Sequence, residues 1–225
     1  MNPNIENKVV LITGALDSRG EASARMLAKE GASIILGAAH SERIQALAGE
    51  ILSAGGIALA LETDVTDDRQ VQALMEAILR IYGRIDVLIH IPGRISPPEN
   101  GGPGEWSRGI DTWIRSMLHT IAAVLPGMKE RKAGHIISVA SVAGLPAELG
   151  EAAHSAIQEA VKRFSEELQR RIPPDHLQTT LISADILSAE MLAEAILSAV
   201  SQPREMGHGE RVLPPIPGDG TKDHV

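Results

Sequence analysis

The sequence contains no cysteine, which excludes disulfides, thiolate catalysis and cysteine-ligated metal centres. Aromatic residues are nearly absent as well: the 225 residues include two Trp, one Tyr and one Phe, so a mechanism that needs a tyrosine must use Tyr82. No apolar run reaches the roughly 18 residues of a membrane span, and the first residues lack the pattern of a secretory signal. We therefore expect a cytoplasmic protein.

An excess of positive charge is also missing. Lys and Arg number 21 against 29 Asp and Glu, a net charge of −8, which argues against nucleic acid or an anionic membrane as a partner. The eight histidines have no metal-ligand spacing, so no metal site is expected. The length suits one domain, expected over residues 1–213, with a mobile tail over 214–225.

Short β-branched runs alternate with amphipathic segments along the whole chain. The runs predict strands at 8–13, 32–37, 57–62, 86–90, 135–141, 179–183 and 211–213. The segments between them predict helices at 20–30, 41–54, 67–82, 106–131, 150–171 and 188–201, with Ser41 as an N-cap. This alternation is typical of a doubly wound parallel sheet of the Rossmann type, whose ligands bind beyond the carboxyl ends of the strands.

Several motifs occur in an order that resembles the short-chain dehydrogenase/reductase (SDR) family over nearly the whole chain. They are Lys8–Gly14 with Gly20, Asp64–Val65, Ala123–Met128, Gly134–Ile137 and Ser141–Gly144. Members of that family are mostly NAD(P)-dependent oxidoreductases with a catalytic set of Asn, Ser, Tyr and Lys. The resemblance therefore implies a Rossmann-type fold and a dinucleotide site, which must be checked residue by residue.

The glycine-rich loop of the resemblance is only partly kept. Gly14 and Gly20 match the first and third glycines, but the middle one is Ser18, whose Cβ crowds the approach of a phosphate to the backbone. The resemblance implies a weakened site for NAD or NADP, or a site that has lost cofactor binding. Its residues stand at the positions of the family's glycine-rich loop, its adenine-contacting pair and its Asn-Asn-Ala-Gly segment. These residues are Gly14, Ser18, Arg19, Gly20, Asp64, Val65 and Gly93.

The catalytic set departs further from the family. Ser141 matches the serine, but His154 stands in the place of the tyrosine, Gln158 in that of the lysine and Trp113 in that of the asparagine. Gln158 has no charge with which to lower the pKa of a neighbouring acid. An imidazole, however, can donate or accept a proton at neutral pH without a lysine, so Ser141 and His154 form a candidate acid/base pair.

The segment after the sixth predicted strand is short. Leu181–Asp185 passes directly into a helix that starts near Ser188, so the lid that normally covers nicotinamide and substrate is nearly absent. A hydrolase triad of Ser141, His154 and an acid is disfavoured, because the chain has no nucleophile-elbow motif.

Three hypotheses follow. In the first, the protein is a catalytically silent structural or regulatory subunit, paired with an active SDR paralogue. In the second, it is an unconventional NAD(P)-dependent carbonyl/alcohol oxidoreductase that uses His154 and Ser141. In the third, it is a non-redox isomerase or lyase. In each case the long apolar stripes in the helices at 113–131 and 150–171 predict a homo- or hetero-oligomer.

Overall fold

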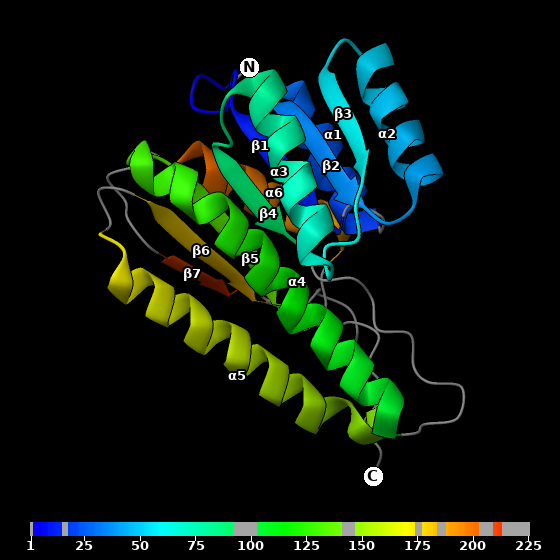
Figure 1. Ribbon diagram of the computed structural model, residues 1–225, viewed down its shortest axis with the longest axis vertical. Coiled ribbons are helices and arrows are strands. Elements are labelled where there is room, and N and C mark those ends of the chain that lie inside the picture. The colour runs from blue at the N-terminus through cyan, green and yellow to red at the C-terminus, as the bar shows by residue number, and fades with distance from the viewer. Residues whose placement is uncertain are drawn as a thin grey trace.

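The computed structural model describes residues 2–14, 18–91, 103–140, 147–173, 177–183, 188–202 and 209–212. Within these residues, seven parallel strands form one sheet in the order β3-β2-β1-β4-β5-β6-β7 (Figure 1). The strands are β1 (Val9–Thr13), β2 (Ser33–Ala38), β3 (Ile57–Glu62), β4 (Val87–His90), β5 (His135–Ala140), β6 (Gln178–Ser183) and β7 (Gly209–Val212). The predicted doubly wound, Rossmann-type sheet is therefore confirmed.

Six helices connect these strands and cover both faces of the sheet (Figure 1). They are α1 (Ser18–Lys29), α2 (Ser41–Ser53), α3 (Asp68–Tyr82), α4 (Pro103–Glu130), α5 (Ala147–Arg171) and α6 (Ala189–Ser201). One face packs on α1, α2 and α6, and the other on α3, α4 and α5. Each face has its own apolar core, because the strands are buried on both sides.

The strand order reverses between β1 and β4, and this position defines where a ligand is expected. β1 pairs with β2 on one side and with β4 on the other, so Thr13 lies opposite both Gly37 and His90. The crevice of a doubly wound sheet lies at such a reversal, beyond the carboxyl ends of the strands. The amino-terminal halves of α4 and α5 extend beyond the same edge (Figure 1).

Most helix boundaries lie within three residues of those predicted, and one cap differs. Ser41 was predicted as the N-cap of α2, but Ser41 is already the first helical residue. The N-cap is His40, which has an extended backbone and a side chain that makes no capping hydrogen bond. The predicted start at Ser188 is confirmed, because its hydroxyl accepts the backbone N–H of Met191 at 3.1 Å. Residues 184–188 are then the whole connection from β6 to α6, so the lid is short.

Gly49 gives a first test of the helical layer. It lies exposed inside α2, and a Cβ added there would meet no atom within 4 Å. Alanine loses less backbone entropy than glycine on folding, so Gly49→Ala is expected to stabilise the protein by about 0.5–1 kcal/mol. Urea denaturation measures this difference, and a destabilised variant would contradict the placement of Gly49 in a regular, uncrowded helix.

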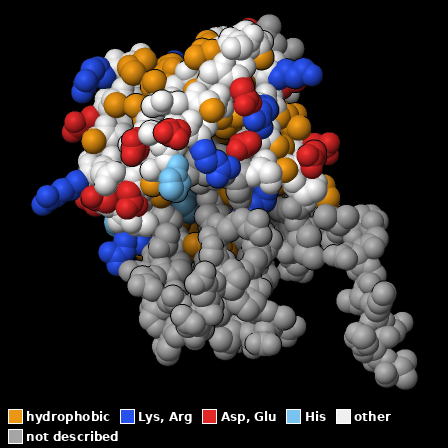
Figure 2. Space-filling view, turned by 90° about the vertical axis from the view of Figure 1, so that its right-hand side faces the viewer, with side chains coloured by type: hydrophobic (Ala, Val, Ile, Leu, Met, Phe, Trp, Pro, Cys, Tyr) orange, Lys and Arg blue, Asp and Glu red, His pale blue; other side chains and the backbone are white. Residues whose placement is uncertain are grey.

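The surface of the described residues has no large region of one charge on the side that Figure 2 presents, where acidic and basic side chains are interspersed. Within the described ranges, none of the helices is both long and apolar enough to cross a bilayer. The same ranges hold no cluster of three or more His, Asp or Glu side chains suited to a metal ion. The predicted tail at 214–225 lies outside the described residues.

Candidate functional site

The turn that follows β1 is built around a glycine. Gly14 has a φ of 80°, in the left-handed region that favours glycine. A Cβ added there would overlap the carbonyl oxygen of Ile91, so the backbones of the β1 and β4 ends approach closely at this point. The backbone N–H of Ile91 donates to the Thr13 carbonyl at 3.0 Å and closes this junction. The first glycine of the predicted loop is therefore required by the fold itself.

The helix that follows this turn begins at Ser18, two residues earlier than predicted. Ser18 is exposed, whereas Arg19 is only 7% exposed and Gly20 is buried. The Ser23 hydroxyl donates to the Arg19 carbonyl at 2.8 Å within the first turns of α1. Thus Ser18 presents its side chain at the open start of a helix, where N–H groups and the helix dipole favour an anion.

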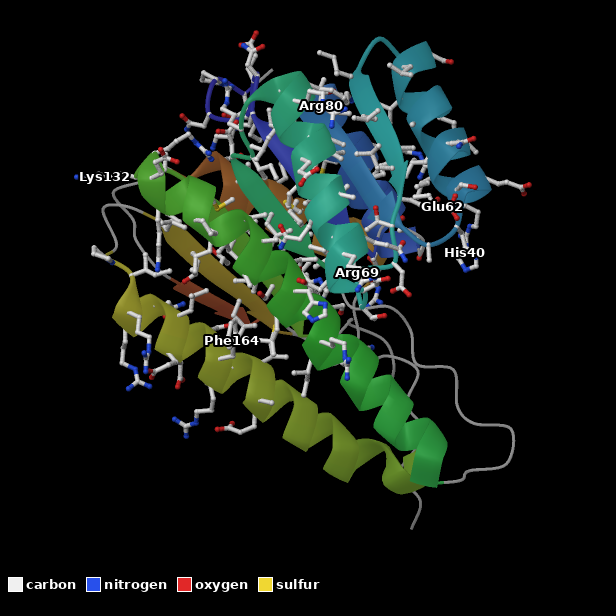
Figure 3. The ribbon with its side chains drawn as sticks, in the orientation of Figure 1. His40, Glu62, Arg69, Arg80, Lys132 and Phe164 are labelled. Carbon is white, nitrogen blue, oxygen red and sulfur yellow. The ribbon has the colours of Figure 1, made fainter. Side chains whose placement is uncertain are left out.

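A second group of predicted residues lies beyond β3. The Asp64 carboxylate accepts the backbone N–H and the hydroxyl of Thr66, at 2.9 and 2.7 Å, while the Asp64 N–H donates to Gln70. These bonds fix the turn that carries Asp64 and Val65 from β3 into α3. Figure 3 shows His40, Glu62 and Arg69 at this same end of the sheet, so the ends of β2 and β3 share one exposed rim. Two parts of the predicted site, Gly14 with Ser18–Gly20 and Asp64–Val65, thus belong to the same carboxyl edge.

These residues fit a dinucleotide in outline. A glycine turn that brings two strand ends together and an exposed helix start supply a place for a pyrophosphate. The rim at His40 and Asp64 lies at the ends of the neighbouring strands, β2 and β3. Gly93 falls outside the described residues, as does Ser141.

The catalytic positions are described only in part. His154 and Gln158 lie in the first half of α5, where the backbone is described and their side chains are not. Trp113, in the place of the family's asparagine, is 6% exposed and belongs to the apolar core under α4. A buried indole cannot take over the hydrogen bonds of an asparagine amide. Trp113, which the resemblance places at the asparagine position, therefore serves packing.

Tyr82 is far from this edge. It is the last residue of α3, which starts at the carboxyl rim and runs back along the sheet; Figure 3 shows Arg69 and Arg80 at its opposite ends. A helix of 15 residues is about 22 Å long, so Tyr82 cannot reach the site. Tyr82 packs against the apolar core, and partial burial raises its pKa. Tyr82 therefore has a packing role and does not take part in a tyrosine mechanism at this edge.

Sequence reasoning missed the polar group at the centre of the edge. His90 ends β4, is 3% exposed, and bonds through Nδ1 to the Thr13 hydroxyl at 2.9 Å. Its Nε2 lies 3.4 Å from the Ser116 hydroxyl on α4. Burial lowers the pKa of His90 to about 4, so the ring is neutral at pH 7. The signals in the sequence were a polar residue at the end of the apolar run Val87–Ile89 and its place at the start of the segment that resembles the family's Asn-Asn-Ala-Gly.

Comparison with known proteins agrees with this geometry. A model of the family described as short chain dehydrogenase matches residues 8–198. The chain is 32% identical to an uncharacterized oxidoreductase of Staphylococcus saprophyticus, covering 94% of this chain and 97% of that protein. It is 35% identical to an uncharacterized oxidoreductase of Listeria innocua, covering 90% and 82% of the two chains.

Solved structures give the same result for the fold. A metagenomic short-chain oxidoreductase in complex with NADP superposes with a TM-score of 0.81 at 24% identity, covering 94% of this chain and 99% of that one. Serine dehydrogenase from Escherichia coli superposes with a TM-score of 0.80 at 26% identity, covering 92% and 98%.

Proposed function

The chain belongs to the short-chain dehydrogenase family, and from this premise we propose that it is an NAD(P)-dependent oxidoreductase with an atypical acid/base pair. The dinucleotide binds at the carboxyl edge between β1, β2 and β3. Ser141 and His154 act on the carbonyl or alcohol oxygen of the substrate. The relatives' names as oxidoreductases and the NADP complex of a structural neighbour support this proposal.

The observation that carries the proposal is the junction of Gly14 with Ile91. A left-handed glycine packed against the carbonyl of a neighbouring strand leaves position 14 no room for a side chain. In a doubly wound sheet a dinucleotide places its pyrophosphate at the turn between the first strand and its helix, and the close approach of Gly14 to Ile91 at this position supports such a site. Gly14 thus supports a nucleotide loop at this position, although Ser18 stands in the place of the loop's middle glycine.

The chain's own residues divide the work of binding. Gly14, Ser18, Arg19 and Gly20 hold the pyrophosphate through backbone N–H groups, the Ser18 hydroxyl and the Arg19 charge. Asp64 and Val65 line the adenine end. When bound, NAD(P) supplies the acceptor or donor of a hydride. Residues Gly37 to His40 include neither an acid for a ribose diol nor an arginine for a 2′-phosphate, which leaves His40 as the candidate for contact with a 2′-phosphate.

His154 moves the proton in this proposal. An imidazole has a pKa near 6.5 and is present in both forms at neutral pH, so it can protonate or deprotonate the substrate oxygen without the help of a cation. Ser141 donates a hydrogen bond to the same oxygen. Gln158 is neutral, so it supplies no positive charge that would lower the pKa of a neighbouring tyrosine. An imidazole at position 154 does not need that charge.

A catalytically silent subunit is the second candidate, and the burial of Trp113 favours it. With Trp113 in the core and Tyr82 at the opposite edge, two of the family's catalytic groups have no equivalent in the described part of the site. In this candidate, the helices at 113–131 and 150–171 pair the chain with a second copy or with an active paralogue. Exposed Leu118, at 39%, lies on the first of these helices.

Replacement of His154 distinguishes the two candidates. In an oxidoreductase, His154→Ala is expected to lower kcat by about 10²–10⁴-fold, because the proton transfer loses its acid/base group. Stopped-flow absorbance of NAD(P)H against a panel of carbonyl compounds measures the loss. Glu159→Gln is the matched control, since Glu159 is an exposed residue of α5 whose carboxylate accepts a hydrogen bond from Arg163.

The silent subunit predicts a different pattern. Wild type, His154→Ala and Glu159→Gln would then show the same absence of turnover, while all three retain the same partner on size-exclusion chromatography. Conversion of a substrate without change in nicotinamide absorbance would instead support the non-redox hypothesis.

A further inference from the structure

His90 lies between two elements that the proposed function uses. It ends β4 beside the Gly14 turn, and α4 passes over it on the other side, so the ring has no access to solvent. A buried polar side chain costs free energy unless its hydrogen bonds are made. Both ring nitrogens of His90 have a hydroxyl as partner, that of Thr13 at Nδ1 and that of Ser116 at Nε2.

The neighbouring bonds fix the direction of the hydrogen bonds. The Ser116 hydroxyl donates to the Trp113 carbonyl at 3.0 Å, so its oxygen can only accept from His90 Nε2–H. Nδ1 then has no proton and accepts the Thr13 O–H at 2.9 Å. The assignment follows from the network, and it leaves each polar atom of His90 satisfied by one neighbour.

We propose that His90, as its neutral Nε2–H tautomer, is a positioning residue that ties the Thr13–Gly14 turn to the Trp113–Ser116 turn of α4. The proposal rests on the proposed function in one respect, since it assigns this link a role in cofactor affinity. Through Thr13, the ring fixes the residue before the glycine turn. Through Ser116, it fixes the turn of α4 that carries Trp113. His90 itself touches neither substrate nor cofactor.

The chain supplies a matched control at the other edge of the sheet. His135 begins β5, is 4% exposed, and bonds through Nε2 to the Thr180 hydroxyl at 2.8 Å. It is therefore a second buried His–Thr pair, in the same sheet, at the amino ends of the strands. A residue whose role is only to stabilise the sheet should behave alike at both places.

The experiment compares His90→Asn with His135→Asn. Dissociation constants of NADH and NADPH are measured by fluorescence at a temperature where both variants are folded. We expect His90→Asn to weaken binding about tenfold, which corresponds to one lost hydrogen bond, and His135→Asn to leave it within twofold. Equal effects of the two variants on binding would overturn the proposal.

A second readout does not depend on any cofactor. In a Trp106→Phe background, Trp113 is the single fluorophore of its kind. We expect its emission to shift to the red in His90→Asn and in Ser116→Ala, because the α4 turn loosens, and to stay unchanged in Thr120→Ala. Thr120 is the control because, among the described residues, its buried hydroxyl donates to carbonyls of its own helix, those of Ser116 and Met117.

The two readouts separate the failure of this proposal from that of the proposed function. If wild type binds neither NADH nor NADPH, the proposed function is wrong, and the Trp113 emission alone decides whether His90 ties β1 to α4. An unchanged emission in His90→Asn overturns the tie whatever the cofactor does. Nitrogen-15 NMR of the ring adds a direct check, since a proton on Nδ1 at pH 7 would contradict the assigned tautomer.

Discussion

Gly14→Ala is expected to destabilise the folded protein by about 2–5 kcal/mol, the sum of a conformational cost and an overpacking cost. Two costs add. A left-handed φ of 80° costs an alanine about 1–2 kcal/mol, and the new Cβ overlaps the Ile91 carbonyl, so β1 or β4 must shift at its end. Urea denaturation followed by far-UV circular dichroism measures the loss.

Gly83→Ala is the control that separates these two costs. Gly83 ends α3 with a φ of 72°, and a Cβ added there would meet nothing within 4 Å. It therefore carries the conformational cost alone, about 1–2 kcal/mol. Equal losses in the two variants would mean that the close approach of Gly14 to Ile91 is absent from the folded protein.

Lowering the pH from about 6.5 to about 4 is expected to reduce the free energy of unfolding steeply. His90 takes up its proton at the upper end of this range in the unfolded chain and at the lower end in the folded protein. The sign follows from the two states. In the unfolded chain the imidazole has a pKa near 6.5, whereas burial lowers the pKa of folded His90 to about 4. Between these values the unfolded state binds one more proton, so stability is full above 6.5 and is lost toward 4.

The size of this effect is about 3 kcal/mol for a shift of this extent, at 1.36 kcal/mol per pH unit. Chemical denaturation at a series of pH values measures it. In His90→Asn the amide does not titrate, so the slope between pH 4 and 6.5 should fall by about one proton. An unchanged slope in that variant would show that His90 is protonated as readily in the folded protein as in the unfolded one.

The fold could be predicted from the sequence because its signals are local. The strands Val9–Thr13 and Ser33–Ala38 are buried on both faces of the sheet. Such strands are recognisable in the sequence as runs of five or six consecutive, mostly apolar residues. The cap of α2 was misassigned to Ser41, because a serine favours the N-cap by its chemistry, whereas the backbone of His40 is what turns from extended to helical.

The candidate site could be predicted only where a motif is contiguous. Gly14 and Asp64 follow directly from the resemblance, and the structure places both at the carboxyl edge. The His90 network could not be found in this way, because Ser116 is 26 residues further along the chain and meets the ring only when α4 packs over β4. Trp113 likewise reveals its packing role only through its burial.

These observations define how the site differs from the family's usual one. The Gly14 turn is part of the junction between β1 and β4, so a side chain at this position would disrupt the sheet. The resemblance places His154 where the family has a tyrosine and Gln158 where it has a lysine, so the side-chain chemistry is expected to differ. A retained nucleotide loop beside an altered acid/base pair is consistent with a dehydrogenase that has changed its proton chemistry.

Calorimetric titration of the wild-type protein with NAD, NADH, NADP and NADPH tests the central claim most directly. The carboxyl edge formed by Gly14, Ser18 and Asp64 predicts that at least one of the four binds with a Kd in the micromolar range. The bound form should also resist urea better than the free protein, by the amount that mass action gives. A folded protein that binds none of the four would contradict the account and leave the nucleotide fold as a scaffold for a partner subunit.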